Sequence, residues 1–334
     1  MSRYAAVHAN PKGLGDARPT AMQIVDDESM RGGLAGKVVV ITGVSSGIGI
    51  ETVRAFAATG AKLFLTVRDL EKAKTALDGI FDEQSMELVQ MDLESLDSVR
   101  AAAKTILAKT DQITILVNNA GVMAIQEREL TIDGYEKQFA TNHLAHFLFF
   151  HLLKPALLAG SSPEFNSRVV VVSAAVHRVQ PLNASDNYNY EKGGYSPWGA
   201  YGHSKLANIY MANELDRRYG ARGLHATSLH PGNIASGLIR HMPQEDINAM
   251  MANKEIMSIL KSPEQGAATT LYAAISKDWE GKGGVYLVDC GVAARGEDDG
   301  QFAALTTSSV TYNLEDEARL WKDSLAMVGL PDEE

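Results

Sequence analysis

Short apolar runs rich in β-branched residues alternate with helix-like runs through most of this chain. The apolar runs lack strict apolar–polar alternation, which is typical of strands covered on both faces, as in a parallel sheet with helices on each side. Regular strand–helix alternation predicts an α/β fold: one Rossmann-type domain built on a doubly wound parallel sheet with helices on both faces. The expected strands are 37–43, 62–67, 86–93, 113–121, 168–173, 224–232 and 283–290.

The two ends of the chain lie outside this alternation. Residues 1–35 are polar and rich in glycine and proline, and we expect them to form a partly ordered arm. Residues 36–300 carry the alternation and are expected to form the domain, and residues 301–334 are expected to form a C-terminal extension.

Charge and cysteine usage restrict the partners and the compartment. The net charge of −10 over 334 residues disfavours nucleic acid and anionic membranes, because both are bound by basic faces. The single cysteine, Cys290, rules out an intramolecular disulfide framework and fits a reducing compartment. The first twenty residues lack the apolar core of a signal peptide, and the most apolar stretch, 144–158, is too short to span a bilayer. We therefore expect a cytoplasmic protein with no membrane span.

A glycine-rich sequence, TGVSSGIG from Thr42 to Gly49, stands where the first strand passes into a helix. The backbone amides at a helix N-terminus attract phosphate groups. The glycines at 43, 47 and 49 differ from the GxGxxG spacing of the ordinary dinucleotide-binding fold. Such turns also occur merely to allow close packing, but the order strand, turn, helix favours a phosphate-binding role.

The end of the second strand indicates the cofactor type. An acidic residue there binds the ribose hydroxyls of NAD, whereas a basic residue pairs with the 2′-phosphate of NADP. Arg68 comes first after the apolar run, and Asp69 suits a helix N-cap, although Arg68 could equally be a solvated loop residue. We therefore expect NADP, with NAD less favoured. Asp92, after the third strand, either accepts a hydrogen bond from adenine or caps the next helix.

The sequence YGHSK places Tyr201 and Lys205 four residues apart on one face of a helix expected to begin near Tyr201. A free phenol has a pKa of ~10, but a nearby ammonium group and a positive nicotinamide ring favour the phenolate and make the phenol a usable acid–base group. An isolated YxxxK occurs by chance, but here it follows TGVSSGIG, NNAG (118–121) and Asn142 in order. Asn142 lies within a helix, where asparagine is unfavourable, so it is satisfied locally or held for a purpose.

With TN in TNHLAHF and with HPGNIAS, these motifs resemble the short-chain dehydrogenase/reductase superfamily over roughly residues 36–300. NHLAHF and the long insertion before AYGHSKLAN are similar to the retinol-dehydrogenase-like branch, which includes the oxidoreductase portion of WW-domain oxidoreductases; no WW domain occurs here. The resemblance implies NAD(P) at the carboxyl ends of the strands, Tyr201 as the acid–base group, Lys205 on the nicotinamide ribose, and Asn142 as the anchor of a water that leads from Lys205 to solvent. The residues expected to border the cofactor are Gly43, Ser45, Ser46, Gly47, Ile48, Gly49, Arg68, Asp92, Leu93, Asn119, Ala120, Gly121, Tyr201, Lys205, Pro231, Gly232, Ile234 and Ser236, the last replacing the family's usual threonine.

One catalytic position departs from the pattern of this branch. Its fifth strand commonly ends in a serine pair, and the second serine contacts the substrate oxygen. When His177 is aligned with the branch's usual histidine, Ser173 matches the first serine and Ala174 the second. Successive residues of an extended chain face opposite ways, so Ser173 joins Tyr201, Lys205 and Asn142 in catalysis only if the strand end twists or bulges. Otherwise Ser173 only hydrogen-bonds to backbone.

The resemblance implies hydride transfer between a nicotinamide and a carbonyl or carbinol carbon. The segment 234–261 is expected to be a lid over a lipophilic small-molecule substrate, because methionines suit an adaptable apolar pocket, although they serve equally in ordinary packing. The alternative is a repurposed member that binds NADP but does little redox chemistry, as a non-redox catalyst or a binding scaffold; Ala174 favours this alternative. The methionines concerned are Met242, Met250, Met251 and Met257.

Two further expectations concern metals and assembly. His143, His146 and His177 lack the supporting cysteine or carboxylate spacing of a metal site, so no metal is expected. The helices carrying Asn142 and Tyr201 commonly form a dimer interface in the family, so a homodimer is one option, which the N-terminal arm or the C-terminal tail could block or alter.

Overall fold

The computed structural model describes residues 2–234, 236–301 and 304–332, and within them the strands form one sheet in the order β3-β2-β1-β4-β5-β6-β7-β8. Neighbouring strands from β3 to β7 are parallel, and β8 pairs antiparallel with β7. This sheet confirms the doubly wound α/β prediction; the antiparallel β8 was not predicted, because two residues give no periodicity. The strands are β1 Val38–Thr42, β2 Lys62–Val67, β3 Met86–Gln90, β4 Ile115–Asn118, β5 Ser167–Val172, β6 Leu224–His230, β7 Val285–Val288 and β8 Gly291–Val292.

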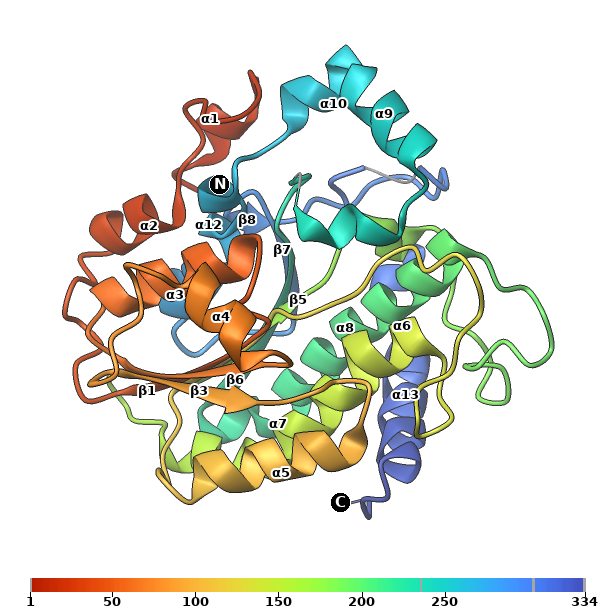
Figure 1. The fold of residues 1–334 in the computed structure, drawn as a ribbon. Coiled ribbons are helices and arrows are strands. Elements are labelled where there is room, and N and C mark those ends of the chain that lie inside the picture. The colour runs from red at the N-terminus through yellow and green to blue at the C-terminus, as the bar shows by residue number, and fades with distance from the viewer. Residues whose placement is uncertain (1, 235, 302–303, 333–334) are drawn as a thin grey trace.

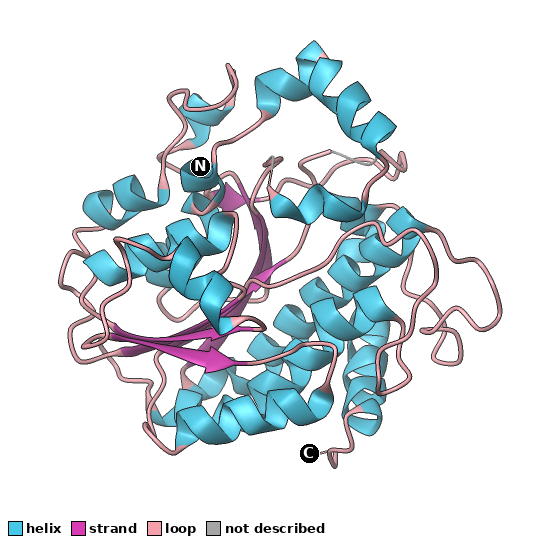
Figure 2. Ribbon diagram, viewed as in Figure 1, coloured by secondary structure: helices cyan, strands magenta, loops and turns pink. Residues whose placement is uncertain are grey.

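Helices cover both faces of the sheet (Figure 2). The α-helices are α1 Ala5–His8, α2 Ala21–Asp27, α3 Ile48–Ala58, α4 Leu70–Ala76, α5 Leu96–Leu107, α6 Lys137–Phe139, α7 Ala145–Ala159, α8 Pro197–Tyr219, α9 Gln244–Ala252, α10 Lys254–Ile259, α11 Pro263–Gly266, α12 Ala268–Ile275 and α13 Leu314–Met327. A π-helical turn, η1, spans Ala140–Leu144, and 3-10 turns span η2 Ala175–Arg178, η3 Gly220–Arg222, η4 Gly237–His241, η5 Lys277–Trp279 and η6 Ser309–Thr311.

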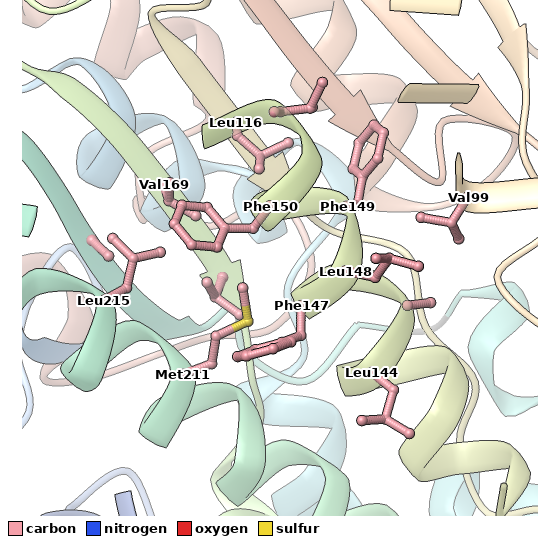
Figure 3. Packing of buried hydrophobic residues seen from close by; sticks show 14 of the residues in the cluster. Val99, Leu116, Leu144, Phe147, Leu148, Phe149, Phe150, Val169, Met211 and Leu215 are labelled. Atoms are coloured by element: carbon pink, nitrogen blue, oxygen red, sulfur yellow. The ribbon is translucent and has the colours of Figure 1, made fainter. Parts of the chain in front are cut away.

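Alternate residues of the central strands supply two separate apolar cores. Val40 of β1 packs into a core formed with α5, α7, α8 and α13, whereas Val39 and Ile41 pack into the core formed with α2, α3, α4 and α12. Figure 3 shows part of the first core, where Phe147 and Phe150 of α7 lie near Met211 and Leu215 of α8. Burial on both faces explains why the strands read as continuous apolar runs.

Local capping sets where the functional helices begin. Asp69 caps α4 and Ser95 caps α5, each accepting a hydrogen bond from a backbone amide three residues later. Helix α8 begins at Pro197, four residues before the expected start at Tyr201, because Ser196 accepts from the Gly199 amide and proline suits the first helical position. Tyr201 therefore lies one turn inside a capped helix, where its position is well defined.

The chain ends pack on the domain (Figure 1). Helix α2 lies against α3 and α12, so much of the N-terminal arm is folded onto the core, and α13 packs along α8. The segment 237–259, with η4, α9 and α10, arches over the carboxyl ends of the strands at the top of Figure 1. Among the described residues, no helix is both long and apolar enough to cross a membrane.

Candidate active site

A cavity of about 720 Å³ opens at the carboxyl ends of the parallel strands. Its walls come from the β1–α3 turn, from the ends of β2 to β6, and from the segment 237–259. The strands predicted at 86–93 and 113–121 end earlier than expected, at Gln90 and Asn118, and the residues beyond these ends turn into the cavity. This is the crevice where open α/β sheets bind ligands.

The glycines of the β1–α3 turn keep the backbone close to its neighbours. Gly43 has φ +74°, and a Cβ there would lie 2.7 Å from the Ala120 Cα atom. A Cβ on Gly49 would lie 2.2 Å from the Gly43 carbonyl oxygen, so Gly49 serves packing and does not line the cavity. Helix α3 has Gly47 as its N-cap and no side-chain cap, which leaves its first backbone amides available for a phosphate.

Asn119 ties the end of β4 to the glycine-rich turn. Its Nδ2 donates to the carbonyl oxygens of Thr42 at 2.9 Å and Gly43 at 3.0 Å. The Thr42 hydroxyl accepts from the amides of Asn119 and Ala120, both at 3.0 Å. Asn119 lines the cavity, and its buried Oδ1 has no hydrogen-bond partner within the described chain, so this oxygen is an unused acceptor at the cavity wall.

The charged residues at the ends of β2 and β3 line the cavity, and their two aspartates also accept hydrogen bonds from nearby backbone amides. Asp69 Oδ1 accepts from the Lys72 amide at 3.0 Å, and Asp92 Oδ1 accepts from the Glu94 amide at 3.0 Å, so both carboxylates act in local turns. The Arg68 side chain is 66% exposed and lies 3.4 Å from Glu94 Oε1. Lys72 also lines the cavity; the sequence reasoning missed it, although it lies one turn into the helix after Arg68.

Asn142 lies in the π-helical turn η1 and bridges two elements. Its Oδ1 accepts from the Val122 amide at 2.8 Å, and its Nδ2 donates to the Val122 carbonyl and to Ser204 Oγ, both at 2.9 Å. Ser204 Oγ donates in turn to the Tyr201 carbonyl at 2.7 Å. Asn142 does not line the cavity; it holds helix α8 beside the segment that follows β4.

Tyr201 and Lys205 are buried on the cavity side of α8. Lys205 Nζ donates to the Val172 carbonyl at 3.0 Å and lies 5.6 Å from the Tyr201 ring centroid. Burial raises the pKa of Tyr201 above its ordinary value and lowers the pKa of Lys205 to about 7. The expected lowering of the phenol pKa by Lys205 is therefore not found, because burial disfavours the charged form of both groups. Tyr201 is held in its proton-donating form.

Ser173 and Ala174 are the two residues that directly follow β5. Ser173 Oγ donates to the Lys205 carbonyl at 2.7 Å, and the side chain is buried. Ser173 and Lys205 both line the cavity. Ala174 lines it as well, but contributes only a methyl group. Of the two roles left open for Ser173, the hydrogen bond to backbone is the one in the structure.

The loop after β6 completes the far wall. Gly232 has φ +107°, a conformation that residues with a side chain rarely adopt, and it packs against the Lys261 side chain. Ser236 Oγ accepts from the Leu238 amide at 3.3 Å. Met242 and Met250 line the cavity, whereas Met251 is exposed and Met257 does not reach the cavity. Further large apolar residues that line the cavity are Met123, Val176, Trp198, Leu238, Ile239, Ile256, Ile259 and Leu260.

With Gly49 as the exception, all the residues expected to border the cofactor line this one cavity. Glycines that admit close approach, free amides at α3, and the unpartnered Asn119 oxygen fit a dinucleotide. Within the described ranges no group of three histidine, cysteine or acidic side chains could hold a metal ion. His143, His146 and His177 each contact a buried serine or threonine hydroxyl instead.

Comparisons with known proteins identify the family of the chain. Residues 37–246 match the family model for short chain dehydrogenases. The chain is 48% identical over 328 residues to short-chain dehydrogenase/reductase prx1 of Penicillium roqueforti, covering 98% of this chain and 95% of that protein. It is 37% identical over 302 residues to retinol dehydrogenase 11 of Homo sapiens, covering 89% and 87%. A crystal structure of an uncharacterized Mycobacterium paratuberculosis protein matches with TM-score 0.67 at 30% identity, covering 95% and 98%.

The chain therefore belongs to the short-chain dehydrogenase/reductase family, in its retinol-dehydrogenase-like branch. It is an NAD(P)-dependent oxidoreductase of that family.

Proposed function

We propose that the enzyme uses NADP to interconvert a carbonyl and a primary or secondary alcohol on a lipophilic small molecule. One observation carries the proposal: the buried Tyr201–Lys205 pair lies in a single cavity whose walls are polar toward Arg68 and apolar toward Met242. The polar part fits a dinucleotide and the apolar part fits the substrate. NADP, when bound, supplies or accepts the hydride.

Each catalytic group has a role in the reducing direction. Tyr201, held protonated by burial, donates its proton to the oxygen of the carbonyl as negative charge develops there. Lys205 lies one turn away, where its ammonium form stabilises the phenolate that remains. Asn142 positions the helix that carries both residues, through Val122 and Ser204.

The preference for NADP rests on the cations near the end of β2. Arg68 and Lys72 line the cavity, and their positive charges suit a 2′-phosphate. The competing carboxylate, Asp69, accepts a hydrogen bond as the cap of α4. An NAD-binding carboxylate would instead be directed at the ribose hydroxyls.

A second candidate is a family member that binds NADP but catalyses little redox chemistry. Ala174 favours it, because the usual second hydroxyl is missing, and the Ser173 hydroxyl is bonded to the Lys205 carbonyl. Loss of one donor to a developing oxyanion costs about 2.7–4 kcal/mol of transition-state stabilisation. That loss slows an enzyme without removing its hydride chemistry.

The experiment is to follow loss of NADPH absorbance with a panel of apolar cyclic and linear ketones and aldehydes. We expect turnover of at least one compound, and we expect Tyr201→Phe to lower kcat by about 10²-fold or more. Tyr201→Phe should still bind NADPH, measured by cofactor fluorescence, because the ring and its packing are kept. If NADPH binds, no carbonyl is reduced, and Ala174→Ser creates activity, the second candidate is correct.

A further inference from the structure

His230 ends β6 and carries a buried polar atom that the chain leaves unused. The residue is 5% exposed and lines the cavity together with Ala174 and Tyr201. Its Nδ1 accepts a hydrogen bond from the Ala175 amide at 3.3 Å. Its Nε2 is buried and has no partner in the described part of the chain.

The hydrogen bond to Ala175 determines which ring nitrogen of His230 carries the proton. A backbone amide can only donate, so Nδ1 must present its lone pair. Burial, with Lys261 nearby, lowers the pKa of His230 to about 3, although Asp289 opposes the shift. The imidazole is therefore neutral near pH 7, and its single proton lies on Nε2. His230 Nε2–H is a hydrogen-bond donor that lacks an acceptor.

A carbonyl oxygen that receives negative charge needs donors around it, and this site is short of them. Tyr201 is one donor; Ser173 donates to the Lys205 carbonyl, and Ala174 has no polar atom. Four of the described side chains that line the cavity have a buried polar atom without a hydrogen-bond partner. Among them, His230 accepts a hydrogen bond from the amide of Ala175, the residue next to Ala174. The others are Thr66, Asn119 and Thr141, toward β1 to β4.

We propose that the His230 Nε2–H group donates a hydrogen bond to the substrate oxygen and thereby replaces the hydroxyl missing at Ala174. This inference rests on the proposed function. In reduction, the hydride of NADPH goes to the carbonyl carbon and the Tyr201 proton goes to the oxygen. His230 keeps its proton throughout and acts only as a donor, so the step balances without a further reactant.

Two substitutions separate the two nitrogens of the ring. His230→Asn keeps an acceptor near the Nδ1 position, facing the Ala175 amide, but has no donor at the Nε2 position. His230→Gln places an amide donor near the Nε2 position but loses the short acceptor. With the best ketone of the panel, we expect kcat to fall about 10²-fold in His230→Asn and less than about tenfold in His230→Gln. Adding Ala174→Ser to His230→Asn should restore most of the loss.

Two readouts do not depend on turnover. Long-range ¹H–¹⁵N spectra of histidine-labelled protein should show His230 as the Nε2–H tautomer; an Nδ1–H tautomer would overturn the proposal. NADPH fluorescence and thermal melting should be nearly unchanged in His230→Asn, so that a lower kcat reports on the reaction and not on folding or cofactor binding. If His230→Asn melts early, the His230→Gln variant and the tautomer decide the matter.

The outcomes distinguish this inference from the proposed function. A wild-type enzyme that reduces ketones while His230→Asn keeps its kcat refutes the role of His230 and leaves the proposed function intact. A wild-type enzyme that binds NADPH but reduces no ketone refutes both. A selective loss in His230→Asn that Ala174→Ser rescues supports both.

Discussion

At the end of β2, Arg68 is one of the two cations on which the proposed preference for NADP rests. The Arg68 side chain is 66% exposed, and its Nη1 lies 3.4 Å from the Glu94 carboxylate. Such a surface pair contributes little to stability, so the side chain can reorient toward a phosphate at small cost. A doubly charged phosphate offers it stronger, charge-assisted hydrogen bonds.

We therefore expect Arg68→Ala to raise the KM for NADPH about tenfold, which corresponds to ~1.4 kcal/mol, and to leave the KM for NADH nearly unchanged. Steady-state kinetics with both cofactors measures this. Arg31→Ala is the matched control, because Arg31 is also exposed and paired with a carboxylate, Asp26, but lies on the N-terminal arm. An equal rise in the KM for both cofactors would show that Arg68 does not bind the 2′-phosphate.

Lys205 carries a stability cost because its side chain is buried. Burial lowers its pKa to about 7, so the unfolded chain binds more protons than the folded protein between roughly pH 7 and the ordinary lysine value of 10.5. Stability contributed by this group therefore rises with pH through that window and is lowest below pH 7.

Lys205→Met should raise the free energy of unfolding at pH 6, by on the order of 3 kcal/mol, and should abolish turnover. The gain should be smaller at pH 9, because the folded lysine is already neutral there and neutralising the lysine of the unfolded chain costs less than at pH 6. Urea unfolding of both proteins at the two pH values tests this. The Val172 carbonyl keeps a donor in the variant, because Asn208 Nδ2 lies 3.2 Å away. A gain that is the same at both pH values would contradict the assignment of the cost to charge burial.

At the scale of elements, the N-terminal arm holds the end of the segment that covers the cavity. The Arg18 side chain is 4% exposed and donates to the carbonyls of Ile259 at 2.8 Å and Leu260 at 2.6 Å, at the end of α10. Asp16 holds the guanidinium from the other side at 2.8 Å, and Gln265 donates to the Arg18 carbonyl at 3.0 Å. Ile259 and Leu260 line the cavity, so the arm is hydrogen-bonded to part of the cavity wall.

Arg18→Met should loosen this end of the lid, because two backbone carbonyls lose a charged donor while the apolar stem is kept. We expect a five- to tenfold rise in the KM for the ketone, which corresponds to a loss of ~1–1.4 kcal/mol of binding free energy. Limited proteolysis between residues 237 and 259 should also become faster. Arg3→Met is the control, since Arg3 lies on the same arm but is half exposed and pairs with Glu28. Unchanged KM and unchanged cleavage would show that the arm does not restrain the lid.

At the scale of the whole molecule, α13 covers the helices that commonly form the dimer interface of the family. Trp321 of α13 is 2% exposed and meets Phe147 of α7 edge to face, with ring centroids 5.0 Å apart. The buried Glu317 accepts from Asn213 Nδ2 of α8 at 2.7 Å. A homodimer through this face would require α13 to leave it. The C-terminal tail therefore blocks the face through which the family commonly dimerises.

We therefore expect a monomer in light-scattering chromatography. Deleting residues 312–332 should expose the apolar surface of α7 and α8 and produce dimers or aggregates with a lower melting temperature. Lys322→Ala, on the same helix, serves as the control because it leaves the apolar contacts in place. A stable dimer of the full chain would show that another surface associates.

The sequence alone determined the parallel sheet and the edge of the sheet where the cavity lies, and all but one of the residues expected to border the cofactor line that cavity. Strand patterning depends on a period of two residues and helix capping on neighbours within one turn, and both are local. The motifs that carry the family resemblance are local as well: TGVSSGIG, NNAG and YGHSK each place their residues within one strand–helix junction or one turn.

Tertiary structure alone decided the properties that depend on distant segments. The pKa values of Tyr201 and Lys205 follow from burial, which depends on the whole fold. The partner of Ser173 comes from helix α8, thirty-two residues away. The unpartnered nitrogen of His230 and the hydrogen bonds from Arg18 to the end of α10 could not be predicted for the same reason. Desolvation and long-range hydrogen bonds are set by which segments meet in space, and a one-dimensional pattern does not record those meetings.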